Sequence, residues 1–262
     1  MKKKRRYIYH DLLKDDFAGT SINAKPLPEN YSYLVKDPFS IAFGFLFYWG
    51  IAKPLLWLYG KLFMGVQVKG RKNLKKVKHQ GYFYYSNHTQ IADGWAMQAY
   101  VSCGKRTYIV ANQDATSIPG IRHLVKMIGC LPIPANLNET KKFIDAVETL
   151  IKKGKAISIY PEAHIWPYYT HIRPFNEDSF VYPAALNAPV IATCTTYRRR
   201  KIFKNLPPKI TIHVSKPFYP NEHQSIPERK KDLRDRVYEY MVEMSCSEEN
   251  VEYAEYIYEP LE

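Results

Sequence analysis

Cysteine is scarce in this chain of 262 residues, and its four cysteines are scattered without a Cys-x-x-Cys pair. No histidine accompanies them at the spacing of a zinc site. The pattern predicts neither a disulfide framework nor a bound metal, and it is typical of proteins in a reducing, cytosolic setting. Internal repeats and low-complexity linkers are also missing, which indicates one large domain rather than a repeat array.

The chain also lacks an unbroken apolar run of the roughly 20 residues that a membrane-spanning helix needs. Residues 39–52 carry no charge, but Lys53-Pro54 interrupts them before the apolar character resumes. We predict two short helices that meet near Pro54 and lie in the membrane interface or re-enter it, with tryptophan and tyrosine at headgroup level. The alternative is a pair of helices buried in the protein core.

Acidic residues are outnumbered, with 25 Asp and Glu against 38 Lys and Arg, and the formal net charge is +13. Such a field attracts anionic lipid, phosphorylated cofactors or nucleic acid. Because no nucleic-acid-binding module accompanies the charge, we expect no nucleic acid partner. We divide the chain into a basic N-terminus with membrane-interfacial helices (1–65), a main domain (66–246) and an acidic C-terminal tail (247–262).

Short β-type runs alternate with helical ones after residue 66, which predicts an α/β fold with a mixed sheet flanked by helices. One helix is predicted over 139–153 with Asn138 as its cap, and another over 225–245 that opens with a capping box. The last two strands should be antiparallel neighbours joined by a basic loop. The predicted strands are 66–69, 82–86, 107–111, 156–160, 190–197 and 209–214.

Residues with catalytic chemistry gather in the segment SNHTQIAD, where one predicted strand ends and a helix follows. His88 and Asp93 are five positions apart, which is the wrong spacing for one face of a continuous helix. We therefore place His88 on the loop and Asp93 at the helix start, where its carboxylate can fold back onto the imidazole. Such a carboxylate fixes the tautomer of a histidine that activates a hydroxyl group.

The His-x4-Asp spacing is a weak signal by itself, because His10 and Asp15 share it in a charged stretch with no preceding strand. A second motif, YPEAHIWP, follows another predicted strand and places Glu162 at its carboxyl end, where open α/β sheets build their sites. Taken singly, His88 would be an ordinary loop histidine and Glu162 a surface carboxylate. Their combination favours one shared site.

The runs SNHTQIAD, GCLPIPAN, YPEAHIWP and APVIA resemble, in order and spacing, the four blocks of the glycerolipid acyltransferase family, the PlsC-type 1-acylglycerol-3-phosphate acyltransferases. The resemblance covers roughly residues 66–196. It implies a glycerol-3-phosphate acyltransferase-like fold and fatty-acyl transfer from acyl-CoA or acyl-carrier protein to a lysophospholipid, first among them 1-acylglycerol-3-phosphate. It also implies that His88 is the general base, that Asp93 orients it, and that no cofactor is required.

The sequence departs from the family pattern at Asn112, Ala135 and Ile165, which stand where basic residues are usual. Basic groups of this kind grip an acceptor phosphate by charge-assisted hydrogen bonds. Either relocated groups hold the phosphate, with Arg173 the first candidate and His164 the second, or the acceptor lacks a simple phosphate. The candidate substrate-binding residues are Asn87, Glu162, His164 and Arg173.

Two other functions stay open at this point: non-catalytic binding of anionic membranes, and hydrolysis of a thioester by a water that His88 activates. The expected partners are membrane lipids and an acyl-thioester donor, including acyl-carrier protein if that carries the acyl group. The expected location is the cytoplasmic face of a membrane, with the protein held peripherally or in one leaflet.

Overall fold

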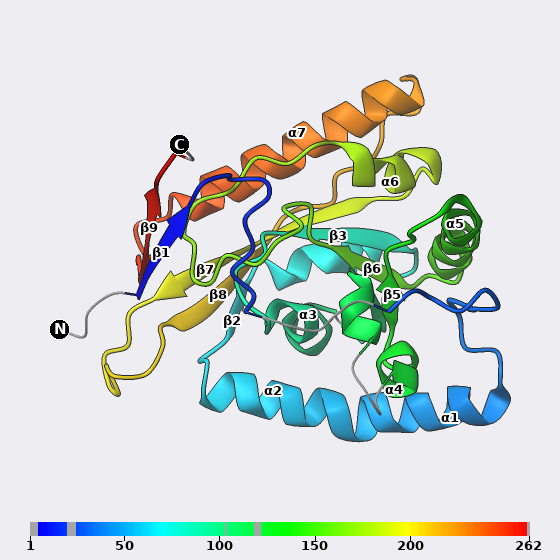
Figure 1. Cartoon of the computed structure of the whole chain (residues 1–262), viewed down its shortest axis with the longest axis horizontal. Coiled ribbons are helices and arrows are strands. Elements are labelled where there is room, and N and C mark those ends of the chain that lie inside the picture. The colour runs from blue at the N-terminus through cyan, green and yellow to red at the C-terminus, as the bar shows by residue number, and fades with distance from the viewer. Residues whose placement is uncertain (1–4, 20–24, 103, 118–121, 261–262) are drawn as a thin grey trace.

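The computed structural model describes residues 5–19, 25–102, 104–117 and 122–260, and a seven-stranded sheet forms its centre (Figure 1). Strands β7 and β8 are antiparallel, and the other neighbouring strands of this sheet are parallel. The predicted mixed α/β fold is therefore confirmed. The strands in spatial order are β2 (Gln67–Lys69), β8 (Lys209–Val214), β7 (Val190–Arg198), β3 (Tyr82–Ser86), β6 (Ala156–Ile159), β4 (Thr107–Ala111) and β5 (Cys130–Pro132).

A second, two-stranded sheet joins the two ends of the chain, because β1 (Arg5–Tyr9) pairs in parallel with β9 (Ala254–Tyr258). Neither strand was predicted from the sequence, and β9 lies in the segment predicted as an acidic C-terminal tail. The ring of Tyr256 stacks on Tyr7 and on Trp166, so this sheet covers the loop that follows β6. The basic residues at positions 2–4 lie outside the described part of the chain.

Helices cover both faces of the large sheet (Figure 1). Alternate side chains of β3 point to opposite faces, as a strand requires. Phe83 and Tyr85 join one buried cluster with α5 and α7, whereas Tyr82 and Tyr84 join another with residues after β2 and around α3. The α-helices are α1 (Pro38–Phe47), α2 (Lys53–Leu62), α3 (Asp93–Ala96), α4 (Arg122–Met127), α5 (Leu137–Lys152), α6 (Val181–Ala185) and α7 (Ile226–Ser245).

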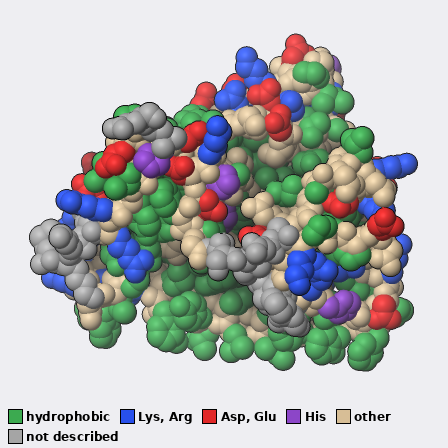
Figure 2. Space-filling model, in the orientation of Figure 1, with side chains coloured by type: hydrophobic (Ala, Val, Ile, Leu, Met, Phe, Trp, Pro, Cys, Tyr) green, Lys and Arg blue, Asp and Glu red, His purple; other side chains and the backbone are tan. Residues whose placement is uncertain are grey.

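The apolar N-terminal segment forms one continuous helix, Pro38–Leu62, rather than two helices that meet at Pro54. A π-helical turn at Tyr48–Ala52 joins α1 to α2 and accommodates the missing amide of the proline without a break. By length and composition the helix could cross a membrane, and only 11% of its most apolar window is buried, which argues against a core helix. Figure 2 shows its apolar side chains along the edge that Figure 1 assigns to α1 and α2.

Helix α5 begins at Leu137, two residues earlier than predicted, because Asn136 rather than Asn138 is the capping residue. The Asn136 side chain accepts a hydrogen bond from the amide of Glu139 (2.9 Å) and donates one to its carboxylate (2.8 Å). Such reciprocal bonds satisfy amides that a helix start leaves without partners. The predicted capping box of Ser225 and Glu228 is present at the start of α7.

Candidate active site

The two motif-bearing loops leave the same edge of the sheet. Strands β3 and β6 are parallel neighbours with Tyr85 opposite Ile159, so the loops that follow them emerge side by side. Backbone hydrogen bonds then join the loops directly, because the carbonyl of His88 accepts from the amide of Trp166 at 3.1 Å. The convergence expected from two strand ends is present.

His88 and Asp93 form the contact that their spacing predicts, with 3.3 Å between Nδ1 of His88 and Oδ2 of Asp93. The same carboxylate oxygen accepts hydrogen bonds from the amides of Thr89 (2.7 Å) and Gln90 (2.8 Å). These three contacts fix a buried carboxylate at the start of α3. Since Asp93 occupies Nδ1, the nitrogen left for a substrate is Nε2.

The pair His10 and Asp15 has the same spacing and, contrary to the prediction, also follows a strand, β1, but its geometry differs. Asp15 accepts a hydrogen bond from the backbone amide of His10 at 2.6 Å, not from its ring. The ring nitrogen Nδ1 of His10 instead lies 2.6 Å from the carbonyl oxygen of Glu259. This carboxylate therefore stabilises a turn and orients no imidazole.

Tyr160 is a site residue that the sequence analysis missed. Its ring stacks on the His88 imidazole with centroids 4.3 Å apart, and its hydroxyl donates to the carbonyl oxygen of Asp93 at 2.7 Å. Burial raises the pKa of this phenol, so it remains a neutral donor. In the sequence, the position of Tyr160 directly before Pro161-Glu162 was the one indication that it belongs to the site.

Glu162 lies beneath the His88 loop rather than on the cavity wall. One carboxylate oxygen accepts from the amide of His88 (3.1 Å), and the other accepts from the amide of Arg173 (3.0 Å). The side chains of Glu162 and Arg173 also form a buried ion pair, with 3.4 Å between Oε2 and Nη2. Burial raises the pKa of Glu162, and the neighbouring Arg173 charge and the two amides oppose that shift.

Arg173, the first candidate for holding a phosphate, is 1% exposed. Its guanidinium donates to the carbonyl oxygens of Leu12 and His164 in addition to its ion pair with Glu162. It also lies over the ring of Trp166, with 5.0 Å to the centroid. The guanidinium therefore connects three segments of the chain: the one that contains Leu12, the loop of residues 162–166, and its own.

The other two candidate binding residues also contact protein groups. The Asn87 amide group bridges β3 to β7, donating to the carbonyl of Thr195 (3.1 Å) and accepting from its amide (2.8 Å). His164 is partly exposed, and its Nδ1 lies 3.7 Å from Oδ2 of Asp16. Asp16 belongs to the N-terminal segment, which the sequence analysis did not connect with the site.

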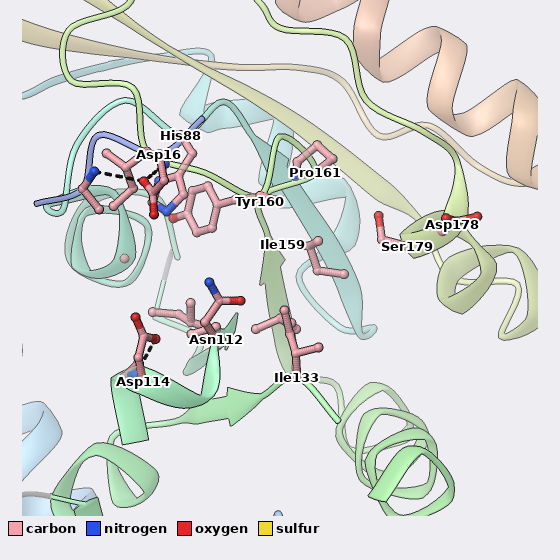
Figure 3. A pocket seen from close by; sticks show the side chains of 18 of the residues that line it. Asp16, His88, Asn112, Asp114, Ile133, Ile159, Tyr160, Pro161, Asp178 and Ser179 are labelled. Atoms are coloured by element: carbon pink, nitrogen blue, oxygen red, sulfur yellow. Dashed lines mark hydrogen bonds between the residues drawn. The ribbon is translucent and has the colours of Figure 1, made fainter. Parts of the chain in front are cut away.

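A cavity of about 560 Å³ opens beside His88 (Figure 3). Figure 3 shows His88 and Tyr160 adjacent on one side, with Asn112, Asp114 and Ile133 across from them. Apolar side chains form most of the wall, which suits a ligand with a hydrocarbon part. They include Ile91, Ile109, Val110, Ile133, Phe143, Ile159, Ile165 and Tyr182.

The charged groups on this wall are acidic. Asp16, Asp114 and Asp178 line the cavity, and among the described lining residues there is no lysine or arginine. Of the six predicted site residues, all described, only His88 lines it. Asp93, Asn87, Glu162 and Arg173 lie behind the surface, where they position the loops.

Ala163 has a left-handed backbone, with φ of 63°, and so does Tyr168 with φ of 62°. This conformation costs a non-glycine residue about 1 kcal/mol. It persists in a loop that is held in place by the buried carboxylate of Glu162, which accepts hydrogen bonds from the amides of His88 and Arg173, as expected where a site imposes a local shape.

Comparison with known proteins adds three findings. A family model described as Acyltransferase matches residues 65–196. Among solved structures, the chain is similar to the crystal structure of the 1-acyl-sn-glycerophosphate (LPA) acyltransferase PlsC from Thermotoga maritima, with 18% identity and a TM-score of 0.58 over 80% of this chain and 88% of that one. The comparison with curated proteins gave no significant match.

Proposed function

Because the chain belongs to the Acyltransferase family and is an O-acyltransferase, we propose that it transfers a fatty-acyl group from an acyl thioester to the hydroxyl of a lysophospholipid, with His88 as the general base. One observation carries the proposal: an imidazole oriented by a buried carboxylate lies on the wall of a largely apolar cavity. The expected donor is acyl-CoA or acyl-carrier protein.

In the proposed mechanism, Nε2 of His88 takes the proton of the acceptor hydroxyl while the hydroxyl oxygen attacks the thioester carbonyl carbon. The tetrahedral intermediate collapses with breakage of the carbon–sulfur bond, and the imidazolium returns its proton to the leaving thiolate. Asp93 keeps the other imidazole proton on Nδ1 and stabilises the imidazolium. Tyr160 restricts the rotation of the imidazole by stacking on it.

The first candidate acceptor is 1-acylglycerol-3-phosphate, which the family resemblance favours. Its phosphate would need a cation near the cavity, and His164, beside Asp16, is the one predicted binding residue whose side chain is partly exposed rather than buried. The positive charge of the chain as a whole supports capture of an anionic acceptor.

A second candidate is a lysolipid without a phosphate monoester. The acidic residues on the cavity wall favour it, because an uncompensated carboxylate repels a phosphate at short range. The burial of Arg173 against Glu162 points the same way. Both candidates keep the same transfer chemistry at His88.

An acceptor screen with a labelled acyl donor tests the function and separates the candidates. We expect labelled ester to form with a lysolipid acceptor, and free acid to form much more slowly without one. Lysophosphatidic acid and monoacylglycerol are compared in wild type and in Asp114→Asn. If Asp114 repels the acceptor, its substitution raises kcat/KM for lysophosphatidic acid alone; release of free acid regardless of acceptor would instead establish a thioester hydrolase.

A further inference from the structure

A second cavity, of about 660 Å³, lies at the other end of strand β4 from the first. Its wall includes Arg106 and Tyr108 near the start of β4, whereas the first cavity includes Ala111 at the end. The two cavities share no described residue, so the second is a separate feature.

Cations dominate the polar wall of this cavity. No aspartate or glutamate is among the described residues that line it, which contrasts with the acidic wall beside His88. The lining cations are Lys105, Arg106, Lys126, Lys153 and Lys155. A concentration of one sign in a concave site creates a strong local field for the opposite charge.

Three of these cations, Lys105, Arg106 and Lys126, contact aromatic rings or carbonyl groups instead of carboxylates. Arg106 lies 5.5 Å from the ring centroid of Tyr48 and 5.2 Å from that of Tyr108, and its buried Nε has no hydrogen-bond partner. Lys126 lies 5.1 Å from the ring centroid of Tyr31. Such contacts offset part of the cost of burial and leave N–H donors available.

The lysines also crowd one another. Lys105 donates to the carbonyls of Val77 (3.1 Å) and Gly154 (2.9 Å), so the fold itself holds it in place. Burial, together with the charge of Lys155, lowers the pKa of Lys105 to about 8. Burial and the charge of Lys36 likewise lower the pKa of Lys126. An anion placed among them would relieve both shifts.

The remaining wall is the apolar helix. Ile41, Phe45 and Trp49 line the cavity, and they continue into the exposed apolar side chains of α1. A ligand that fits both parts therefore carries an anionic head and a hydrocarbon tail. A soluble phosphate compound would use the cations but leave this wall uncovered.

We propose that the second cavity binds the phosphate headgroup of an anionic phospholipid of the surrounding leaflet, with the acyl chains lying along α1. The site is distinct from the acyl-transfer site and does not depend on its chemistry. It would fix the depth and orientation of the protein at the membrane, as basic pockets beside membrane helices do for anionic lipids.

The test is flotation of the full chain with vesicles of phosphatidylcholine, with and without phosphatidylglycerol. The variant Lys126→Gln/Lys155→Gln removes two lining charges, and Lys231→Gln/Arg234→Gln on α7 removes the same charge on the far side of the molecule (Figure 1). At about 1 kcal/mol for each cation, the first variant should lose about 30-fold in affinity for the phosphatidylglycerol vesicles. The α7 variant should lose little affinity for these vesicles, and neither variant should bind pure phosphatidylcholine vesicles differently from wild type.

A third variant, Ser40→Glu, keeps every lysine and places a carboxylate on the wall, where it should occupy the cations and weaken the same preference. Circular dichroism establishes that each variant is folded. Equal losses in the cavity and α7 variants would overturn the proposal in favour of diffuse attraction, as would an unchanged preference in the cavity variants. Competition by soluble glycerol phosphate as strong as that by lipid would overturn the assignment to a phospholipid.

Discussion

The backbone amide of His88 donates a hydrogen bond to the buried carboxylate of Glu162 at 3.1 Å. Glu162 thus supports the candidate base from below, while Asp93 orients its ring from the side. The two carboxylates therefore have different tasks, and we expect substitutions to separate them.

Replacing His88 with alanine should lower kcat by about 100- to 10,000-fold, the range for a lost general base. Asp93→Asn should approach this loss, because an amide no longer fixes the tautomer. The measurement is acyl transfer with saturating donor. His10→Ala is the matched control, since the His10 ring does not contact Asp15, and an equal loss there would contradict the assignment.

Glu162→Gln should destabilise the fold by about 3 kcal/mol, because it leaves the buried guanidinium of Arg173 without its ion partner. Chemical denaturation of the purified chain measures this loss. The double variant Glu162→Gln/Arg173→Met should recover part of it, since removing both charges is less costly than removing one. A double variant less stable than the single one would show that hydrogen bonds of Arg173 dominate.

Ala163→Gly should stabilise the protein by about 1 kcal/mol, because glycine adopts the left-handed conformation of residue 163 without steric cost. Thermal unfolding measures the gain. Gly154→Ala is the converse control: its φ is 68°, so the same physical effect predicts a loss. A destabilising Ala163→Gly would mean that the loop relies on a contact of the methyl group.

The exposed apolar face of α1 and α2 should hold the protein at membranes. Phe39, Leu46 and Leu62 are 78%, 68% and 63% exposed, so replacing all three by serine should weaken vesicle binding without lowering the free energy of unfolding. Co-sedimentation with vesicles measures the first and denaturation the second. Gly60→Ala serves as contrast, because its Cβ would lie 2.6 Å from the Tyr100 hydroxyl and disturb folding instead.

The stability of the fold should decrease as the pH falls below about 6.5. Burial, assisted by the charge of Lys69, lowers the pKa of His213 from its ordinary value of 6.5. At pH values between the ordinary and the lowered pKa of His213, the unfolded state therefore binds more protons than the folded state. The free energy of unfolding decreases as the pH falls through this interval. Thermal unfolding across the interval should show a shallower pH dependence in His213→Gln than in wild type.

Local sequence patterns were sufficient for six strands of the large sheet, all except β5, and for the contact of His88 with Asp93. The strands at 82–86, 107–111 and 209–214 have the predicted bounds, because each is an apolar β-run between polar turns. The contact of His88 with Asp93 followed from their spacing together with the predicted helix start at Asp93. Both depend on residues close together in the chain.

Features that join distant segments were decided only by the tertiary structure. The pairing of β1 with β9, the stacking of Tyr160 on His88 and the acidic wall from Asp16, Asp114 and Asp178 have no local signature. Arg173 illustrates the difference: by sequence it was a free cation for a phosphate, yet in the fold it is paired with Glu162 and buried. The sequence determined which chemical groups follow each strand, whereas packing decided which of them face the cavity, because burial depends on segments that are distant in the chain. Leu12, for example, accepts a hydrogen bond from the guanidinium of Arg173, 161 positions away.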